Sequence, residues 1–338
     1  MSLSNPSQLV LRSELMFSGR RVLLVGAPAD RLAAELPADH VALWHWEQGH
    51  HRHALQQGWH SHFGVAPPAD TFDAVLVFMP KAKARLQAVL AVLPAVLGAG
   101  AAVYLVGEKR EGVDSAGKYL QALGDGARKI DRARHCVLWE LRPKAGLAAQ
   151  AMTPRCQTMS VAGLPLSVCS MPGVFSEGRL DEGTALLLQH LPELADGPVL
   201  DFACGSGVIG AYILKRQPHL VLTALDCDAF ALAATEATLS ENSQQAAVLA
   251  SDGLEALQGQ RFASIVTNPP FHDGMRTDMS MSDGFIRGMS RHLQAGGELW
   301  LVANRFLPYA EALQASFKTV RVAAETGKFV VYHALKGA

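Results

Sequence analysis

The sequence has few cysteines and almost no net charge, and each scarcity excludes a class of protein. Its five cysteines form no CxxC pair and no Cys/His pattern with the spacing of zinc ligands. This argues against a zinc site and against a disulfide framework, and it indicates a reduced, cytoplasmic setting. The net charge is −1 over 338 residues, so no strong field directs the chain toward nucleic acid or a membrane.

Patterns of export and of membrane insertion are also missing. The N-terminal stretch MSLSNPSQLVLRSELMF has no basic region followed by an apolar one, so we expect no export. Residues 86–107 are uncharged over about the length of a membrane span, but Pro94, Gly98 and Gly100 interrupt them. We therefore interpret this segment as a helix, a glycine turn and a buried strand, with no membrane partner.

The charges that are present divide unevenly along the chain. The first 150 residues carry 17 Lys and Arg against 13 Asp and Glu, whereas the remainder carries 13 against 18. A mildly basic front half is compatible with an RNA surface, although ordinary solvation explains so small an excess better. The histidine-rich stretch 45–53 has no spacing typical of a metal site on a helix or strand, so we predict no metal.

An internal repeat indicates two domains of one fold. FDAVLVFMP (72–80) matches FASIVTNPP (262–270), and AAVYLVGEKREG (101–112) matches GELWLVANRFLP (297–308). A helical stretch joins the two segments of each copy, and both copies continue to a pair of terminal strands. The repeat also places the uncharged front segment in an ordinary helix–strand unit.

The repeat predicts a domain at 1–145, an Ala-rich linker at 146–160 and a second domain at 161–338. A segment that alternates around a Gly-Leu-Pro turn, 158–170, predicts a hairpin at the entry to the second domain. The front domain is expected to be a cut-down copy that starts at 20–28.

Strands alternate with helices in the back half, which predicts an α/β fold with a mostly parallel, doubly wound sheet. The last two strands are joined only by ETGK (325–328), so they must be antiparallel. Expected strands are 198–203, 220–226, 246–250, 262–267, 297–303, 317–324 and 328–335, and expected helices are 181–191, 207–216, 228–241, 282–294 and 308–316. A parallel sheet that ends in an antiparallel hairpin is the Rossmann-like architecture of class I methyltransferases.

A glycine loop follows the first strand of the back half, in VLDFACGSGVIG (199–210). Gly205, Gly207 and Gly210 satisfy the GxGxxG pattern of dinucleotide sites. However, Asp201 lies four residues before the first glycine, where a carboxylate would repel a pyrophosphate. S-adenosylmethionine has no phosphate and carries a positively charged amino group, so the motif favours this cofactor over a dehydrogenase's nicotinamide.

The next two strands also end at acids. Asp226 is placed to accept both ribose hydroxyls, and Asp252 is suited to the adenine amino group. Helix capping by Asp228, Ser251 or Asp252 is the structural alternative and is compatible with binding. Two cysteines adjoin these motifs and count as candidate cofactor-binding residues, although packing explains them as well: Cys204 and Cys227.

TNPPFHDG (267–274) ends an apolar run with residues that suit catalysis on a planar amine. Such an amine is a poor nucleophile because its lone pair is delocalised into the ring. Two acceptors, the Asn268 side-chain oxygen and the Pro269 carbonyl held by Pro270, would direct the lone pair toward the methyl group. Phe271 would offer a flat face on which a flipped base stacks. We predict Asn268, Pro269, Pro270 and Phe271 as catalytic, and His272 and Asp273 as loop or substrate contacts.

PGVFSEGRLDEGTALLL (172–188), taken with NPPFHDG (268–274), resembles the bacterial ribosomal RNA small subunit methyltransferase C family. Met171 stands where that family usually has leucine, a change of little consequence. The resemblance implies methylation of the N2 amine of guanine 1207 in 16S rRNA by a protein with two tandem methyltransferase-like domains. A monomer is our default expectation, and the substrate is the 16S rRNA, free or in the small subunit. The resemblance also implies no cofactor in the first domain and adds Phe175, Ser176 and Arg179 to the cofactor site.

The front half departs from the catalytic pattern, since VLLVGAP (22–28) has no acid and glycine loop and Met79 replaces Pro269. Lys81, Lys83 and Arg85 could hold RNA there, although a solvated surface is the simpler interpretation. Alternatives for the whole chain are a large-subunit guanine-N2 methyltransferase, an adenine-N6 or protein-glutamine methyltransferase, and a non-enzymatic RNA-binding assembly protein with a decayed site.

Overall fold

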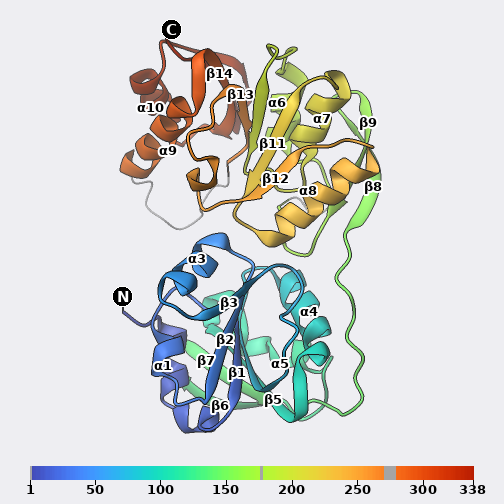
Figure 1. The fold of residues 1–338 in the computed structure, drawn as a ribbon, viewed down its shortest axis with the longest axis vertical. Coiled ribbons are helices and arrows are strands. Elements are labelled where there is room, and N and C mark those ends of the chain that lie inside the picture. Colours follow the sequence, from blue (N-terminus) through green and yellow to red (C-terminus); the bar gives the residue numbers. More distant parts are fainter. Residues whose placement is uncertain (1, 176–177, 270–278) are drawn as a thin grey trace. The chain divides into compact units, whose positions relative to one another are not determined.

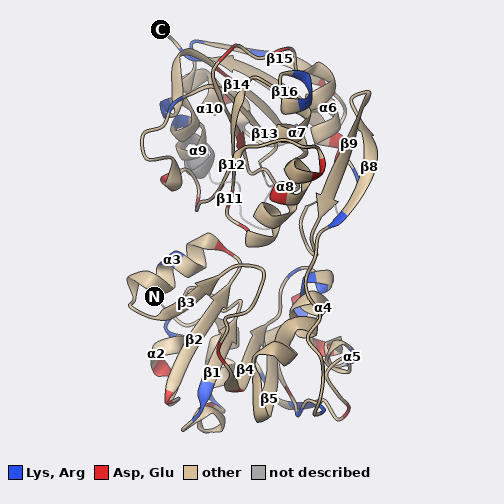
Figure 2. Ribbon diagram, turned by 45° about the vertical axis from the view of Figure 1, so that its right-hand side comes forward, with Lys and Arg blue, Asp and Glu red and all other residues tan. Residues whose placement is uncertain are grey.

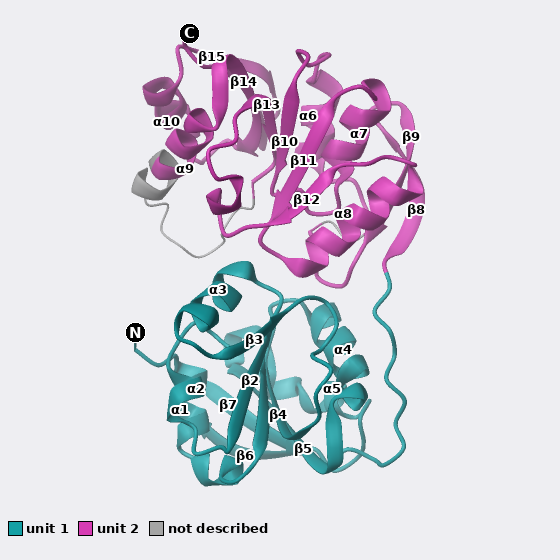
Figure 3. Ribbon diagram, viewed as in Figure 1, with its two compact units in different colours: residues 1–153 teal, residues 154–338 magenta. Residues whose placement is uncertain are grey.

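The computed structural model describes residues 2–175, 178–269 and 279–338 (Figure 1). The chain divides into two compact units, which we call unit 1 (residues 1–153) and unit 2 (residues 154–338; Figure 3). Each unit has its own seven-stranded sheet and is described by itself.

Unit 1 is built on a sheet with the strand order β3-β2-β1-β4-β5-β7-β6. Its strands are β1 (Arg21–Val25), β2 (His40–His45), β3 (His60–Phe63), β4 (Phe72–Phe78), β5 (Leu97–Glu108), β6 (Arg128–Ala133) and β7 (Cys136–Leu141). Neighbours among β1 to β5 are parallel, and β7 pairs antiparallel with both β5 and β6. Its helices are α1 (Asn5–Leu11), α2 (Leu32–Glu35), α3 (Gln48–Gln56), α4 (Lys83–Val92) and α5 (Gly117–Leu120), with short 3-10 turns η1 (Glu14–Phe17), η2 (Leu93–Ala95), η3 (Lys109–Glu111) and η4 (Val113–Ser115).

Unit 2 repeats this order in β12-β11-β10-β13-β14-β16-β15. Its strands are β10 (Pro198–Phe202), β11 (Val221–Asp226), β12 (Ala247–Ala250), β13 (Phe262–Thr267), β14 (Leu293–Asn304), β15 (Thr319–Glu325) and β16 (Phe329–Leu335). The described helices are α6 (Glu182–His190), α7 (Val208–Arg216), α8 (Ala229–Glu241), α9 (Met279–Arg291) and α10 (Tyr309–Ser316), with the 3-10 turn η5 (Glu255–Leu257). A separate antiparallel hairpin, β8 (Arg155–Val161) and β9 (Leu164–Ser170), precedes them. β8 begins inside the segment that the sequence suggested as a linker.

The predicted α/β fold is therefore confirmed in both units. The expectation of a cut-down front domain is wrong for the sheet, which is complete in unit 1, but right for the helices. At the position after the first sheet strand, α2 has four residues where α7 has nine. A complete sheet needs only buried apolar strands, and unit 1 has these.

The two sheets even share an irregularity, which supports the internal repeat. In unit 1 the β4–β5 pairing slips between Phe72 and Ala74, and in unit 2 the β13–β14 pairing slips between Phe262 and Ser264. A glycine with positive φ lies in each bulged strand, Gly100 at +71° and Gly296 at +72°. β14 consequently begins at Leu293, four residues earlier than the sequence indicated.

The uncharged segment 86–107 folds into the end of α4, the turn η2 and the strand β5, so the helix and the strand are confirmed. The predicted glycine turn is wrong, because the turn is Leu93–Ala95 and both Gly98 and Gly100 lie inside β5. Leu86, Val89 and Leu90 of α4 are fully buried against the sheet of unit 1. Within the described residues, no helix has the length and apolar character that crossing a membrane requires.

The sheet of unit 2 has an apolar layer on each face, because alternate residues of its strands point to opposite sides. One layer joins Val199, Val266 and Trp300 to residues of α6, α7 and the hairpin. The other joins Leu200, Ile265 and Leu299 to residues of α9 and α10. In Figure 2 the acidic and basic segments lie mainly on helices, loops and strand ends.

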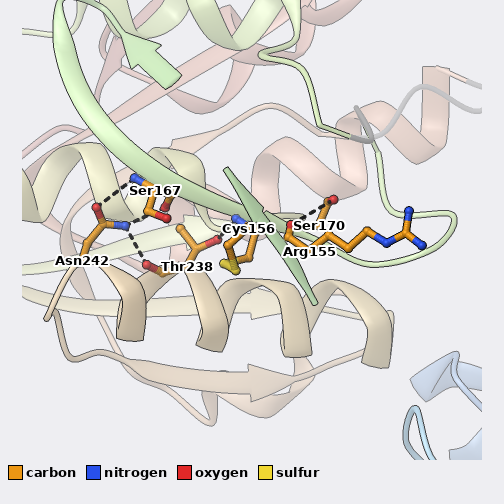
Figure 4. Close-up of a disulfide and its surroundings, with 7 residues drawn as sticks. Arg155, Cys156, Ser167, Ser170, Thr238 and Asn242 are labelled. Carbon is orange, nitrogen blue, oxygen red and sulfur yellow. Dashed lines mark hydrogen bonds between the residues drawn. A yellow bond between two sulfur atoms is a disulfide. The ribbon is translucent and has the colours of Figure 1, made fainter. Parts of the chain in front are cut away.

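The hairpin corrects the prediction that the chain has no disulfide. Cys156 of β8 and Cys169 of β9 are directly opposite in the antiparallel register, with a Cα–Cα distance of 3.9 Å, and are bonded (Figure 4). Spacing rules such as CxxC cannot detect a pair that strand pairing brings together from 13 residues apart. Cys136, Cys204 and Cys227 are not part of this disulfide.

The outer edge of β9 is bonded to side chains of α8, which keeps the hairpin on unit 2. The Cys169 amide donates to Thr238 Oγ1 (2.9 Å), and the Ser167 amide donates to Asn242 Oδ1 (3.1 Å). In return Asn242 Nδ2 donates to the Ser167 carbonyl (2.7 Å; Figure 4). These bonds satisfy edge groups that would otherwise be free to pair with another strand.

Candidate active site

The predicted site residues converge on the carboxyl edge of the unit 2 sheet, where β10, β11 and β13 end side by side. The register pairs Phe202 with Leu225 on one side and with Thr267 on the other. The loop after β10, Asp226 and Asn268 are therefore neighbours in space. Carboxyl ends of parallel strands are where α/β sheets bind ligands.

Two of the glycines after β10, Gly207 and Gly210, are required by close approach. A Cβ on Gly207, where φ is +75°, would lie 2.9 Å from Thr235 Cγ2 of α8. A Cβ on Gly210 would lie 2.6 Å from Leu222 Cδ2 and 3.2 Å from Asp201 Oδ2. The loop thus packs α7 tightly against both α8 and the acid at the end of β10.

Asp201 is fully buried, with 0% of its surface exposed. Its Oδ2 accepts from the Gly210 amide (2.9 Å), whereas Oδ1 has no hydrogen-bond partner among the described residues. Burial raises the pKa of Asp201 to about 7, and the nearby Asp226 carboxylate adds to the rise. An unpartnered buried carboxylate oxygen is costly, and a cationic amino group is the ligand chemistry that relieves it. The residues therefore fit S-adenosylmethionine.

Asp226 is fixed by backbone groups on either side of it. Its Oδ2 accepts from the Gly205 amide (2.9 Å) and its Oδ1 from the Asp228 amide (3.0 Å). Burial raises the pKa of this carboxyl, although these amide bonds oppose the rise. The backbone and the side chain of Cys227 also bond to this carboxylate, so Asp226 is held from several sides at the end of β11.

Cys204 and Cys227, which the sequence predicted as candidate cofactor-binding residues, lie in different environments. Cys204 is buried, its sulfur accepts from Thr235 Oγ1 (3.2 Å), and burial raises the pKa of its thiol. Cys227 is exposed. Cys204 thus contributes to the packed base of the loop, as the packing interpretation predicted.

Asp252 is exposed just after β12, and the residue before it, Ser251, is bonded to the turn η5, whose N-cap is Leu254. Ser251 is buried, and its Oγ accepts from the Ala256 amide (3.0 Å). At the end of β11, Asp228 caps α8 by accepting from the Phe230 amide (2.9 Å). The structure thus confirms helix capping for Asp228.

Asn268 follows β13 and is held by residues that the sequence did not single out. Its Nδ2 donates to Asp181 Oδ2 (2.9 Å) and to Thr184 Oγ1 (2.8 Å). Pro269 is buried. Pro270, Phe271, His272 and Asp273 lie outside the described residues. The Asp-x-x-Thr spacing of residues 181–184 is a signal for the start of a helix, but no local pattern indicates that these residues bond to Asn268.

The segment before α6, expected to cover the cofactor, is described in part. Phe175 is 61% exposed and Arg179 is exposed, whereas Ser176 lies outside the described residues. The Gln157 side-chain amide of β8 donates to the Gly178 carbonyl, which ties this segment to the hairpin. An exposed aromatic ring near a binding edge is available to a ligand. Among the described residues, no group of three or more His, Cys, Asp or Glu side chains could hold a metal ion.

Comparison with known proteins identifies the family. Residues 7–154 match the model described as methyltransferase small domain N-terminal, and residues 165–333 match methyltransferase small domain. Proteins named ribosomal RNA small subunit methyltransferase C from Stutzerimonas stutzeri (strain A1501) and Pseudomonas entomophila (strain L48) are 42% and 43% identical to the chain. In both cases the match covers 98% of this chain and 99% of the relative. The chain belongs to the ribosomal RNA small subunit methyltransferase C family.

A solved member shows the same fold. The T. thermophilus 16S rRNA N2 G1207 methyltransferase, determined in complex with AdoMet and guanosine, superposes with a TM-score of 0.86. It is 24% identical, and the match covers 98% of this chain and 92% of that one. The family resemblance drawn from residues 172–188 and 268–274 is thus confirmed. Met171, the departure from the family's leucine, is 2% exposed and keeps an apolar side chain in that buried place.

Proposed function

We propose that the protein transfers a methyl group from S-adenosylmethionine to the exocyclic N2 amine of a guanine in small-subunit ribosomal RNA. The observation that carries this proposal is the position of Asn268 at the end of β13, beside the buried acid and glycine loop of β10. Membership in the methyltransferase C family supplies the substrate class, and the T. thermophilus relative suggests a guanine equivalent to its G1207.

The cofactor would be held by residues of three strand ends. Asp201 would receive its amino group, Asp226 its ribose hydroxyls and Asp252 its adenine amine, while Gly205 and Gly207 let the backbone approach it. Phe175, Ser176 and Arg179 would cover it. When bound, S-adenosylmethionine supplies an electrophilic methyl group on a positively charged sulfur.

The chain's own residues would prepare the amine. Because both hydrogens of Asn268 Nδ2 are directed to Asp181 and Thr184, the amide oxygen Oδ1 is the atom left for the substrate. That oxygen and the Pro269 carbonyl would each accept one amine hydrogen and so aim the nitrogen lone pair. Pro270 would fix the carbonyl direction and Phe271 would stack on the base. Positioning of this kind, with no metal and no covalent enzyme intermediate, supplies most of the rate.

We further propose that the enzyme works as a cytoplasmic monomer on 16S rRNA, free or in the small subunit. Methylation of guanine N2 in the large subunit, of adenine N6 or of a protein glutamine amide would use the same geometry at Asn268. These reactions remain as outcomes of the test.

The experiment is transfer of labelled methyl from S-adenosylmethionine to small and large subunits prepared without this enzyme, followed by nucleoside analysis. Label as N2-methylguanosine in small-subunit RNA alone is the expected result. Label in large-subunit RNA would move the protein to the sister reaction. No label with intact cofactor binding would indicate a protein or other target, and no binding would overturn the enzyme function.

A further inference from the structure

The hydrogen bonds around Asn268 determine which end of its side-chain amide faces the site. The two ends of an asparagine side chain are nearly identical in shape, so only its partners decide which end faces the site. Asp181 decides here, because its carboxylate oxygen (2.9 Å) can only accept. The Thr184 hydroxyl, which can donate or accept, accepts from the same Nδ2 (2.8 Å). The Nδ2 end is thereby fixed toward α6 and the Oδ1 end away from it.

Asp181 is itself held by the start of α6. It is the N-cap residue of the helix, and its Oδ2 accepts from the Thr184 amide (2.9 Å). Gly183 leaves the space that this arrangement needs, because a Cβ there would lie 3.1 Å from Asp181 Oδ2 and 3.1 Å from Phe329 Cε1 of β16. Thr184 is 5% exposed. One carboxylate oxygen thus serves the helix cap and the Asn268 amide together.

We propose that Asp181 and Thr184 are positioning residues that hold the Asn268 oxygen toward the target amine, and that they select asparagine over aspartate at position 268. This inference rests on the proposed function. A flipped amide would present its NH2 group to an amine that also needs an acceptor, so the pair of donors could not bond. An aspartate at 268 would place a second carboxylate against Asp181 with no hydrogen to share.

The hydroxyl of Thr184 can be tested by two matched variants. Thr184→Val keeps the shape but removes the acceptor, whereas Thr184→Ser keeps the acceptor. We expect Thr184→Val to lower kcat about tenfold or more and Thr184→Ser to lower it less than about threefold. The affinity for S-adenosylmethionine should be unchanged in both. Thr223→Val in β11, a buried threonine outside this group, is the control for the loss of a hydroxyl. Equal kcat values for the valine and serine variants would remove Thr184 from the proposal.

A swap between positions 181 and 268 gives the decisive result. Asn268→Asp should lower kcat at least about 100-fold and also lower Tm, because two carboxylates then meet. Asp181→Asn alone should be mild, since its amide oxygen can still cap α6 and accept from Asn268. The double variant Asp181→Asn/Asn268→Asp restores one donor facing one acceptor. It should recover Tm and at least about tenfold in kcat over the Asn268→Asp protein.

The two readouts separate this inference from the proposed function. If wild-type protein labels neither subunit, the proposed function fails, while the Tm values of the four proteins still report whether positions 181 and 268 are coupled. If the double variant recovers Tm but no activity, the contacts only stabilise the fold and the positioning role is overturned. If it recovers neither, the selection of asparagine by Asp181 is overturned as well.

Discussion

The two units have the same sheet but different strand ends. Pairing registers place Leu24 of β1 where unit 2 has Asp201, His45 of β2 where it has Asp226, and Phe78 at the end of β4 where it has Asn268. Strand order, the antiparallel ending and the slip after Phe72 or Phe262 are all retained. Three polar groups that would serve a cofactor and an amine are thus replaced by two apolar residues and a histidine.

Unit 1 also fills the space that its edge would offer to a ligand. The ring of Trp46, which follows β2, lies so close to Gly26 that a Cβ there would be 2.5 Å from Trp46 Cη2. Arg85 of α4 lies over the same ring at 5.8 Å. Burial lowers the pKa of His45 to about 3, and the neighbouring His50, His51 and His53 add to the fall, so His45 is neutral at physiological pH. Buried strand residues specify the fold in both units, whereas the strand ends specify chemistry in one.

The comparison predicts that Trp46 stabilises unit 1 and takes no part in cofactor binding. Trp46→Ala should lower the free energy of unfolding by about 3 to 5 kcal/mol, because a 5%-exposed ring is removed from a packed site. Denaturant unfolding measures the loss, and equilibrium dialysis should still show one S-adenosylmethionine per chain. Phe175→Ala, which removes an exposed ring, is the control and should leave the free energy of unfolding almost unchanged. A second bound cofactor in Trp46→Ala would contradict the comparison.

Asn268 should carry the next largest effect, on turnover. Asn268→Ala removes an acceptor for the amine and should lower kcat about 100- to 1,000-fold, by analogy with removal of one oriented hydrogen-bonding group. Affinity for S-adenosylmethionine should remain nearly intact, as equilibrium dialysis can show. Phe78→Leu at the equivalent place in unit 1 is the matched control, since it should leave kcat within about twofold. Normal turnover in the alanine variant would exclude Asn268 from the mechanism.

Substitution of Asp201 by asparagine should stabilise the fold but weaken binding of S-adenosylmethionine. The folded pKa of Asp201, about 7, exceeds the usual 3.8, so the unfolded chain loses the proton first as pH rises. The group therefore lowers the free energy of unfolding progressively between pH 4 and pH 7, and Asp201→Asn removes that penalty. Without cofactor, the variant's Tm should exceed that of wild type more at pH 8 than at pH 4.

The same substitution should weaken S-adenosylmethionine binding about 10- to 100-fold at pH 8, because the carboxylate that would bind its amino group is lost. Wild-type affinity should rise between pH 6 and pH 8 as Asp201 ionises, whereas affinity of the variant should not. Calorimetric titration at both pH values measures this. An identical pH dependence in the two proteins would show that Asp201 does not contact the cofactor.

The sequence predicted the features that depend on residues close together in the chain, and it missed those that depend on contacts between distant residues. Alternating strands and helices, the parallel sheet and the terminal hairpins depend on local patterns, and the structure confirms them. Strand ends could also be located, which is why Asp201, Asp226 and Asn268 were found together. The bond from Asn268 to Asp181 spans 87 residues and depends on how α6 packs on the sheet, and no local pattern encodes that.

The missed disulfide has the same cause. Cys156 and Cys169 are paired by hairpin register, which the turn decides: Ala162 (φ +45°) and Gly163 (φ +85°) form the tight two-residue connection. The sequence predicted the hairpin, but it placed the turn at Gly-Leu-Pro, whereas Leu164 and Pro165 lie in β9. It did not predict the register of the strands. A difference of one residue would have put the two sulfurs on opposite faces.

The hairpin is the feature of unit 2 for which the described part of unit 1 has no counterpart, so loss of the disulfide should affect unit 2 only. In oxidised protein, Cys156→Ser should lower the free energy of unfolding by about 1 kcal/mol. A loop of about 15 residues would give about 3 kcal/mol by chain entropy, but the tight turn and the bonds to α8 already restrict this segment. Denaturant unfolding with and without a dithiol reductant measures the difference. Reductant should lower wild type to the level of the variant. Cys227→Ser, at an exposed cysteine outside the disulfide, should match wild type in both conditions. If wild type and Cys156→Ser unfold together without reductant, the bond contributes nothing and the bonds to α8 alone hold the hairpin on unit 2.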